Sequence, residues 1–359
     1  MHSLDLILVR LRLAAVCLLC AIAFGCSSAS HNAPAPTSAA STSAGQNNPT
    51  LTTLLARANY YRAAAGLPPI EASPSLSQAC QKHSAYLVNN HIGASSATIS
   101  DGKLSDLAMQ TGTSEESVGN PFYSEEGAAA ARYSYVIRGA TLPPDATDIV
   151  DQLAALGFTE LLFTNPQLDA AGWGQYCYEG GCVGTFSLKF GLPKEKYRQL
   201  YDSEQAALFN PALGQMPFLR GHLKRAVEMP PSGVILPVTS FGGQSHPSPI
   251  TSCAGYAAPT GVPIMLVVGA PVSGDGPVKL SKQAFAEDGT ELEACGFDST
   301  TYANPDGSEQ REARNVLYEE GAIMLIPKAP LKPGHNYTVS ITADGQDYNW
   351  SFRVASDAR

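Results

Sequence analysis

A change in hydrophobic periodicity near residue 227 constrains what this chain can fold into. Before it, apolar residues recur at helical spacing, as in Leu51, Leu54 and Ala58, which predicts amphipathic helices. After it, runs such as 337–341 and 350–354 place apolar residues at every second position, which predicts strands with one buried face. The chain is therefore predicted to be α+β, with an all-β second part.

The β-rich part spans residues 227–359. About seven short apolar runs lie there between Gly, Pro and Asp residues, which favours a β-sandwich. The closing stretch "IPKAPLKPGHNYTVSITADGQDYNWSFRV" resembles the last hairpin of bacterial Ig-like modules. That resemblance implies a spacer or an adhesive surface. His335, in the same stretch, is interpreted as a turn residue rather than a ligand.

The first 25 residues have the pattern of a signal peptide. Arg10 and Arg12 precede the apolar run "LAAVCLLCAIAFGC", which ends at Cys26. The run is shorter than the roughly 20 residues that a membrane-spanning helix needs. "AFGC" resembles a bacterial lipobox, which implies cleavage before Cys26 and a lipid on that cysteine. Ser27 then favours the outer membrane of a Gram-negative cell, with secretion without a lipid as the alternative.

Residues 26–50 are predicted to be the lipidated cysteine followed by a disordered tether. Residues 27–50 contain no charged and no large apolar side chain, so they cannot bury enough surface to fold. A flexible chain of this length spans about 25–30 Å. The predicted location is the cell envelope, with the membrane as a partner through the anchor. A net charge of −9 and no basic stripe argue against a nucleic-acid partner.

Cysteine placement predicts two disulfides and an oxidising compartment. Cys177 and Cys182 flank a Gly-Gly turn, while Cys253 and Cys295 lie together in the second part. Metal binding by these thiols is the alternative, although no CxxC pair in the mature chain supports it. Cys80 is then left as a buried thiol.

Two histidines occur in "SQACQKHSAYLVNNHIG", on a helix predicted to start with Ser73 as N-cap and Pro74 in its first turn. His83 and His91 are separated by about 12 Å along the helix axis and about 80° around it. They cannot share one ion on a straight helix. His83 is interpreted as a packed helix residue, while His91, at the predicted helix end, could face a cleft.

The opening of the folded part resembles the CAP superfamily, the SCP-like group of cysteine-rich secretory, antigen 5 and pathogenesis-related 1 proteins. In "ANYYRAAAGLPPIEASPSLSQACQKHSAYLVNNH" the matching positions are Asn59, Arg62, Gly66, Leu67, Pro68 and Pro69. In the later stretch 146–176 they are Asn165, Pro166, Leu168, Gly172 and Gly174. The resemblance covers residues 51–192 and implies an α-β-α sandwich. An amphipathic helical pattern at 193–226 predicts a bridge to the Ig-like sandwich at 227–359.

The resemblance also implies a cleft lined by two histidines and two glutamates, which holds zinc or another divalent cation in many members. The first histidine falls on His91, the second on Thr159, and one glutamate near Ser134. The last acid falls at 156–157, where the chain has none. One ligand of the four therefore remains, and zinc at His91 is disfavoured.

Four acids could restore a ligand if this alignment is shifted: Glu115, Glu116, Glu125 and Glu126. Glu116 is retained as a cleft candidate with His91, Ser134 and Thr159. The alternative is that these acids are solvated loop ends or lie at helix N-termini, where carboxylates favour the helix dipole.

The predicted function is non-catalytic binding of an apolar ligand or a surface partner, since some CAP relatives bind sterols or fatty acids. The sequence has no HExxH, no GxSxG and no phosphate-binding glycine loop. No catalytic residue, metal or cofactor is assigned, and a non-catalytic role is favoured while an enzymatic one stays open. The alternatives are a metal-dependent hydrolase of the CAP type and a structural or adhesive surface protein.

Overall fold

The computed structural model describes residues 48–90, 115–139, 146–158, 164–178, 181–191, 198–201, 221–243, 245–272 and 275–358, all within one compact unit. The predictions for the signal peptide, Cys26, the tether and most of the bridge lie outside these residues. Among the described residues, no helix is long and apolar enough to cross a membrane.

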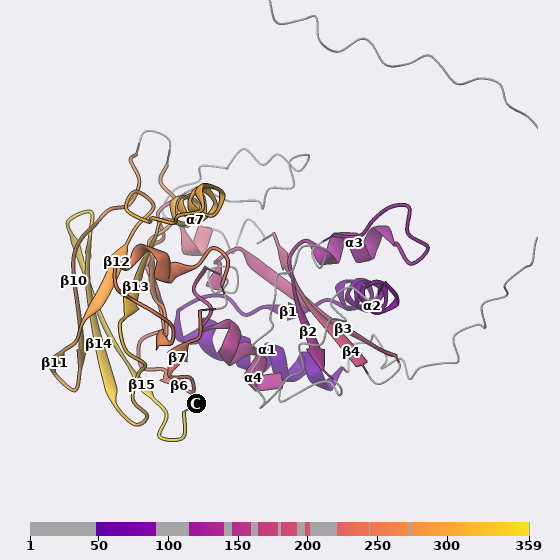
Figure 1. Ribbon diagram of the computed structural model, residues 1–359, viewed down its shortest axis with the longest axis horizontal. Coiled ribbons are helices and arrows are strands. Elements are labelled where there is room, and N and C mark those ends of the chain that lie inside the picture. Colours follow the sequence, from indigo (N-terminus) through magenta and orange to yellow (C-terminus); the bar gives the residue numbers. More distant parts are fainter. Residues whose placement is uncertain are drawn as a thin grey trace, which may run out of the picture. The chain divides into compact units, whose positions relative to one another are not determined.

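The N-terminal half is an α-β-α sandwich around a four-stranded sheet, ordered β1-β3-β4-β2 (Figure 1). Strands β3 and β4 form the antiparallel hairpin that carries Cys177 and Cys182, β2 pairs antiparallel with β4, and β1 pairs parallel with β3. The elements are α1 (Pro49–Ala64), β1 (Glu71–Ala72), α2 (Pro74–Asn89), α3 (Glu125–Ala131), β2 (Ser134–Gly139), α4 (Ala146–Leu153), β3 (Leu168–Tyr178) and β4 (Gly181–Phe190).

Helix α2 lies directly on β3. The helix begins as predicted, with the Ser73 hydroxyl accepting the Leu76 N–H and Pro74 in the first turn. A Cβ atom added at Gly172 would lie 2.6 Å from the Ser77 nitrogen, and one at Gly174 would overlap the backbone at Gln81. Both glycines are therefore required by the close approach of helix and strand.

The opposite face of the sheet packs against α1 and α4. Alternation along the strands sends one set of side chains to this face, where α1 and α4 add their own apolar stripes. The buried cluster includes Leu54, Tyr61, Ile149, Val150, Tyr135, Trp173 and Phe186. Helix layers on both faces confirm the predicted sandwich.

Two residues of the family-like opening have structural roles beside this core. The Asn59 side chain donates to the Ile70 carbonyl at 3.0 Å and accepts the Ile70 N–H at 2.8 Å. The fully buried Arg62 guanidinium donates to the Pro68 and Asn165 carbonyls at 2.9 and 3.0 Å. Burial lowers the pKa of Arg62 to about 9. These side chains fix the chain that leaves α1.

The C-terminal half contains two larger sheets and a two-stranded one. Their strand orders are β11-β10-β14-β15-β6, β12-β13-β9-β5 and β7-β8, and most neighbours are antiparallel. The elements are β5 (Val227–Met229), β6 (Ile235–Leu236), β7 (Ser240–Phe241), η2 (Pro249–Ser252), β8 (Thr260–Gly261), β9 (Ile264–Val267), β10 (Leu280–Glu287), β11 (Thr290–Glu291), β12 (Ala294–Phe297), α7 (Gly307–Glu320), β13 (Ala322–Pro327), β14 (Asn336–Ala343) and β15 (Gln346–Val354).

The two larger sheets differ in how they are buried. Strand β14 alternates between buried and exposed residues, as the sequence predicted for a strand with one buried face. Every residue of β9 and β13 is buried. One face of these strands packs toward the five-stranded sheet, and the other packs against Leu317 of α7 and Phe158. Helix α7 was not predicted, and it explains why "AIMLIP" is apolar throughout.

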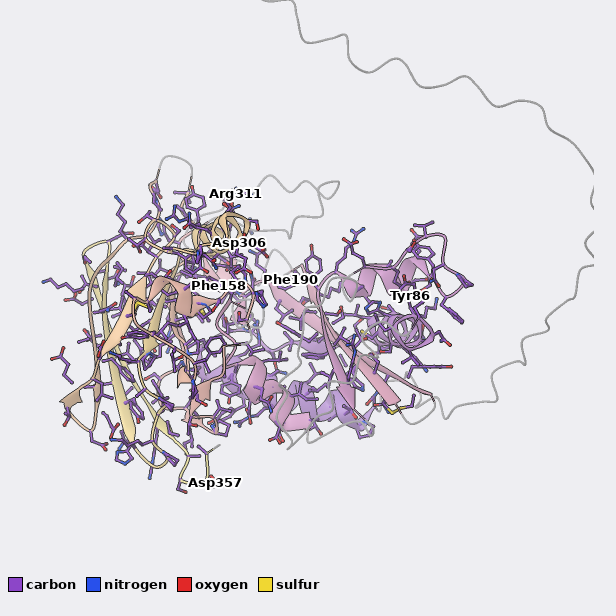
Figure 2. All side chains as sticks on the ribbon, in the orientation of Figure 1. Tyr86, Phe158, Phe190, Asp306, Arg311 and Asp357 are labelled. Atoms are coloured by element: carbon purple, nitrogen blue, oxygen red, sulfur yellow. A yellow bond between two sulfur atoms is a disulfide. The ribbon has the colours of Figure 1, made fainter. Side chains whose placement is uncertain are left out.

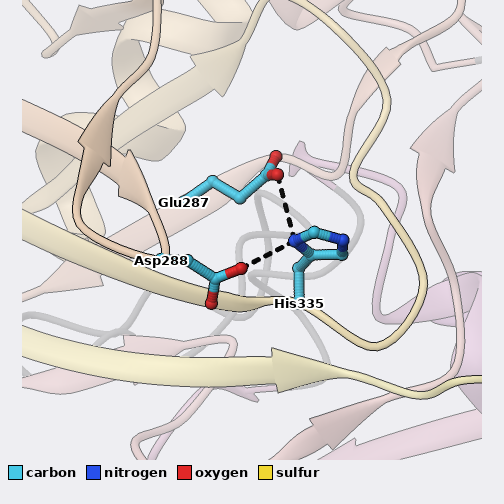
Figure 3. A group of neighbouring side chains, drawn as sticks. All are labelled: Glu287, Asp288 and His335. Atoms are coloured by element: carbon cyan, nitrogen blue, oxygen red, sulfur yellow. Dashed lines mark hydrogen bonds and ion pairs between the residues drawn. The ribbon is translucent and has the colours of Figure 1, made fainter.

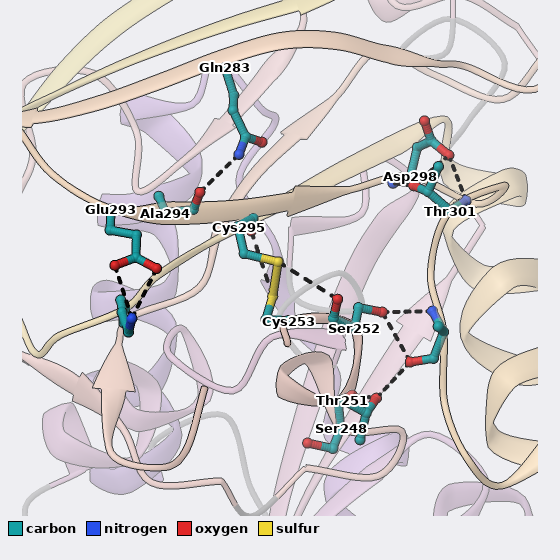
Figure 4. The surroundings of a disulfide bond; sticks show 12 residues. Ser248, Thr251, Ser252, Cys253, Gln283, Glu293, Ala294, Cys295, Asp298 and Thr301 are labelled. Carbon is teal, nitrogen blue, oxygen red and sulfur yellow. Dashed lines mark hydrogen bonds and ion pairs between the residues drawn. A yellow bond between two sulfur atoms is a disulfide. The ribbon is translucent and has the colours of Figure 1, made fainter. Parts of the chain in front are cut away.

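Both predicted disulfides are present. Cys177–Cys182 links the C-terminal end of β3 to the N-terminal end of β4, and Cys253–Cys295 links the segment after η2 to β12 (Figure 4). Near the second bond, the Thr251 hydroxyl donates to the Ala303 carbonyl at 2.9 Å. Cys80 is free and buried, and its burial raises the pKa of this thiol to about 12. The alternative of metal binding by the four paired cysteines is wrong.

Candidate functional site

The four cleft residues predicted from the sequence do not come together as one site among the described residues. His91 and Thr159 lie outside the described residues. Ser134 opens β2, and its hydroxyl donates to the Ala131 carbonyl at 2.9 Å, so it serves the turn after α3. Glu116 is buried and contacts a histidine, but that histidine is His83.

A buried imidazole–carboxylate pair joins α2 to the loop before α3. His83 Nδ1 lies 3.0 Å from Glu116 Oε1, and both side chains are 0% exposed. The Ser124 N–H donates to Glu116 Oε2 at 3.0 Å. A Cβ atom on Gly127 would overlap Glu116 Oε1, so glycine at this position leaves room for the carboxylate. The interpretation of Glu116 as a solvated loop end is wrong.

The other three acids behave as the alternative interpretation predicted or stay at the surface. Glu125 and Glu126 lie in the first turn of α3, whose N-cap is Ser124. Glu126 also pairs with Lys82 at 3.1 Å across two exposed side chains. Glu115 is exposed. The carboxylate that pairs with His83 is that of Glu116.

The loop that carries Glu116, residues 115–124, is fastened to α2 by two further contacts, at Tyr86 and at Asn90. Within α2, the His83 ring stacks on the Tyr86 ring, with centroids 6.3 Å apart. The Tyr86 hydroxyl, labelled in Figure 2, accepts the Ser117 N–H at 2.9 Å. The amide of Asn90, the residue after the helix, exchanges hydrogen bonds with the Asn120 amide. We call residues 115–124 the α2–α3 loop.

Two large apolar side chains of the α2–α3 loop are exposed to solvent. The Val118 side chain is 78% exposed and that of Phe122 is 46% exposed. These are two of the few large apolar side chains that the described residues leave in contact with solvent. Because the loop is fastened to α2 on its inner side, it presents both side chains outward on a fixed support.

A second polar cluster links α1 to α4 and was not found from the sequence. Arg57 Nε and the Tyr61 hydroxyl both donate to Asp151 Oδ1, the latter at 2.7 Å. Burial raises the pKa of Asp151, and the Arg57 and Tyr61 hydrogen bonds oppose that rise. Because two donors hold one oxygen, the cluster acts as a brace between helices.

A third buried acid lies where the two halves of the described chain meet. The Asn165 amide donates to Glu320 Oε1 at 2.7 Å, and Glu320 is the last residue of α7. Burial raises the pKa of Glu320 to about 8, with the Asn165 hydrogen bond acting in the opposite direction. No spacing in the sequence connects residues 165 and 320, so only the fold could identify this pair.

The N-terminal half matches a known family. Residues 55–186 match the model of CAP, the cysteine-rich secretory protein family. This range includes α2, the α2–α3 loop, β3 and the first part of β4. No curated protein matches the chain.

Proposed function

We propose that the CAP domain of residues 55–186 binds an apolar, lipid-type ligand without catalysing a reaction. We also propose that the protein is held in the cell envelope through Cys26. The match to the CAP family does not by itself identify an activity, because fold alone does not imply function. The proposal therefore rests on side chains of this domain.

The observation that carries the proposal is the burial of the His83–Glu116 pair. A general base or a metal ligand must reach the substrate or its water. Both side chains are 0% exposed, and Glu116 Oε2 is already engaged by the Ser124 N–H. The pair therefore serves to fix the α2–α3 loop rather than to act on a substrate.

The two exposed apolar side chains of that loop support a lipid-type ligand. Val118 and Phe122 are exposed on a loop braced by Tyr86 and Asn90. Large apolar side chains exposed on one loop are candidates for an interaction site. A tether of about 25–30 Å after a lipidated Cys26 would keep the domain within reach of a membrane.

The test is sedimentation with phosphatidylcholine vesicles. Zwitterionic lipid suits a chain of net charge −9, and Cys26→Ser removes the anchor in every sample. We expect this protein to sediment with vesicles, and Val118→Ser with Phe122→Ser to release it. The matched control replaces two exposed apolar residues of the C-terminal half, Ile235→Ser with Leu292→Ser, and should sediment as before.

Two outcomes would contradict the proposal. Sedimentation that persists in the Val118→Ser, Phe122→Ser protein would exclude the α2–α3 loop. Failure of the anchor-free protein to sediment would exclude lipid and leave a surface protein as the partner to seek.

A further inference from the structure

Three side chains that can bind a metal converge at one corner of the five-stranded sheet. Glu287 is the last residue of β10, Asp288 follows it, and His335 directly precedes β14. The antiparallel register pairs Glu287 with Tyr337, which brings these chain segments together. Figure 3 shows the imidazole facing both carboxylates. Among the described residues, this is the one group of three potential ligands whose ligand atoms all lie within 4.8 Å of one another.

The spacing of the ligand atoms suits a small divalent cation. His335 Nδ1 lies 2.7 Å from Asp288 Oδ2 and 3.1 Å from Glu287 Oε1. A tetrahedral ion with bonds of about 2.0–2.2 Å separates neighbouring ligand atoms by about 3.3 Å. Small side-chain rotations would provide that separation. One imidazole with two carboxylates favours zinc over calcium or magnesium, which prefer an all-oxygen shell.

Each carboxylate is also held by a hydrogen bond to the oxygen that does not face His335. The Tyr337 hydroxyl donates to Glu287 Oε2 at 3.2 Å, and the Asn336 N–H donates to Asp288 Oδ1 at 3.2 Å. In each case the second oxygen is fixed while the first faces His335. Such supporting hydrogen bonds orient metal ligands. The His335 side chain is 39% exposed, so water can complete the coordination.

A lysine already places positive charge at this corner. Lys332 Nζ lies 2.8 Å from Glu287 Oε1, and the Lys332 side chain is 64% exposed. An exposed ammonium on a flexible stem is weakly held. A doubly charged ion bound by three side chains can displace it, so the lysine and the ion should compete for Glu287.

We propose that Glu287, Asp288 and His335 form a zinc-type divalent cation site on the C-terminal half. The site lies outside residues 55–186 and does not depend on the proposed function of the CAP domain.

The test is calorimetric titration of the full chain with zinc chloride. We expect His335→Ala to weaken the site-specific binding more than about 100-fold, since loss of a supporting contact alone costs 10–100-fold. Lys332→Met should strengthen binding, because it removes the competing cation. The cysteines are the same in every variant, so differences between isotherms report this corner.

The matched control is His246→Ala. His246 Nδ1 pairs with the single carboxylate of Glu309 at 3.0 Å and its side chain is 77% exposed, so its loss should leave the isotherm unchanged. Zinc should also raise the unfolding temperature of the wild type but not of His335→Ala. Three results would overturn the proposal. These are no zinc binding by the wild type, equal binding in His335→Ala and the wild type, and equal loss in His246→Ala.

Discussion

Each half of the molecule contains a histidine beside a carboxylate, and the two groups differ in burial. In the CAP domain, His83 and Glu116 are 0% exposed. In the C-terminal half, His335 is 39% and Asp288 48% exposed. The buried pair has its remaining oxygen engaged by the backbone at Ser124, while His335 and Asp288 are open to solvent. The same residue types therefore fasten a loop in one half and offer ligand atoms in the other.

The difference teaches that burial, rather than residue type, separates a structural contact from a chemical site. A buried polar pair is costly to break. When one partner is removed, the other stays buried with neither a hydrogen-bond partner nor water to replace it. An exposed pair exchanges its partner for water at little cost. The following predictions test this contrast, beginning with the largest effect.

The two disulfides give the largest expected effect and compare the halves directly. Cys253 and Cys295 are 42 positions apart, whereas Cys177 and Cys182 are 5 apart. Loop-closure entropy grows with loop length, so Cys253→Ala with Cys295→Ala should cost about 4 kcal/mol and Cys177→Ala with Cys182→Ala about 2 kcal/mol. Urea unfolding followed by circular dichroism measures both. Equal losses would contradict the loop-length argument.

The buried pair should come next. Glu116→Ala removes the partner of a fully buried imidazole, and we expect a loss of about 3 kcal/mol in the free energy of unfolding. Glu116→Gln keeps the size of the side chain and should lose less. Chemical unfolding of both variants is the measurement. A loss in Glu116→Ala no greater than that of a surface substitution would show that the pair is not structural.

Glu320 should produce an effect that depends on pH and that is smaller than that of Glu116→Ala at pH 6. Its pKa is raised by burial from the ordinary 4.5 to about 8, so the folded state retains a proton that the unfolded state loses. The protein is therefore penalised progressively as the pH rises from 4.5 toward 8. Glu320→Gln removes this penalty and should stabilise the protein by about 2 kcal/mol at pH 6, and by more at pH 8.

Unfolding curves measured from pH 5 to pH 8 test this sign. The gain of Glu320→Gln over the wild type should grow with pH. A gain that is constant across the range, or a loss, would mean that Glu320 is ionised in the folded protein.

The smallest effect should come from the exposed group. His335→Ala in metal-free buffer should leave the unfolding temperature unchanged, because Asp288 is exposed to water and Glu287 keeps its contacts with Tyr337 and Lys332. Differential scanning calorimetry with a chelator present makes the comparison with Glu116→Ala direct. A destabilisation as large as that of Glu116→Ala would break the contrast between the two halves.

Local features of the sequence predicted much of the fold. The Ser73 cap and Pro74 marked the start of α2, since both act within one helical turn. The Gly-Gly turn between Cys177 and Cys182 indicated a hairpin and its disulfide. Alternation marked β14, because a strand with one buried face repeats every second residue. The CAP-like positions at Asn59 and Arg62 indicated the α-β-α sandwich.

Two features of the fold were not accessible in this way. Helix α7 covers the second face of β13, and a strand buried on both faces has no alternation to mark it. The glycines at 172 and 174 matched a family pattern, but the helix that needs them was visible only in three dimensions.

The sequence alone determined the secondary structure elements that rest on neighbouring residues, the two disulfides and the CAP resemblance. Only the tertiary structure decided which distant side chain each of these acids contacts. Glu116 lies 33 positions from His83, Asp288 lies 47 from His335 and Glu320 lies 155 from Asn165. Contacts at such separations depend on how helices pack and strands align. Whether each contact is buried or exposed to solvent depends on the elements that cover it.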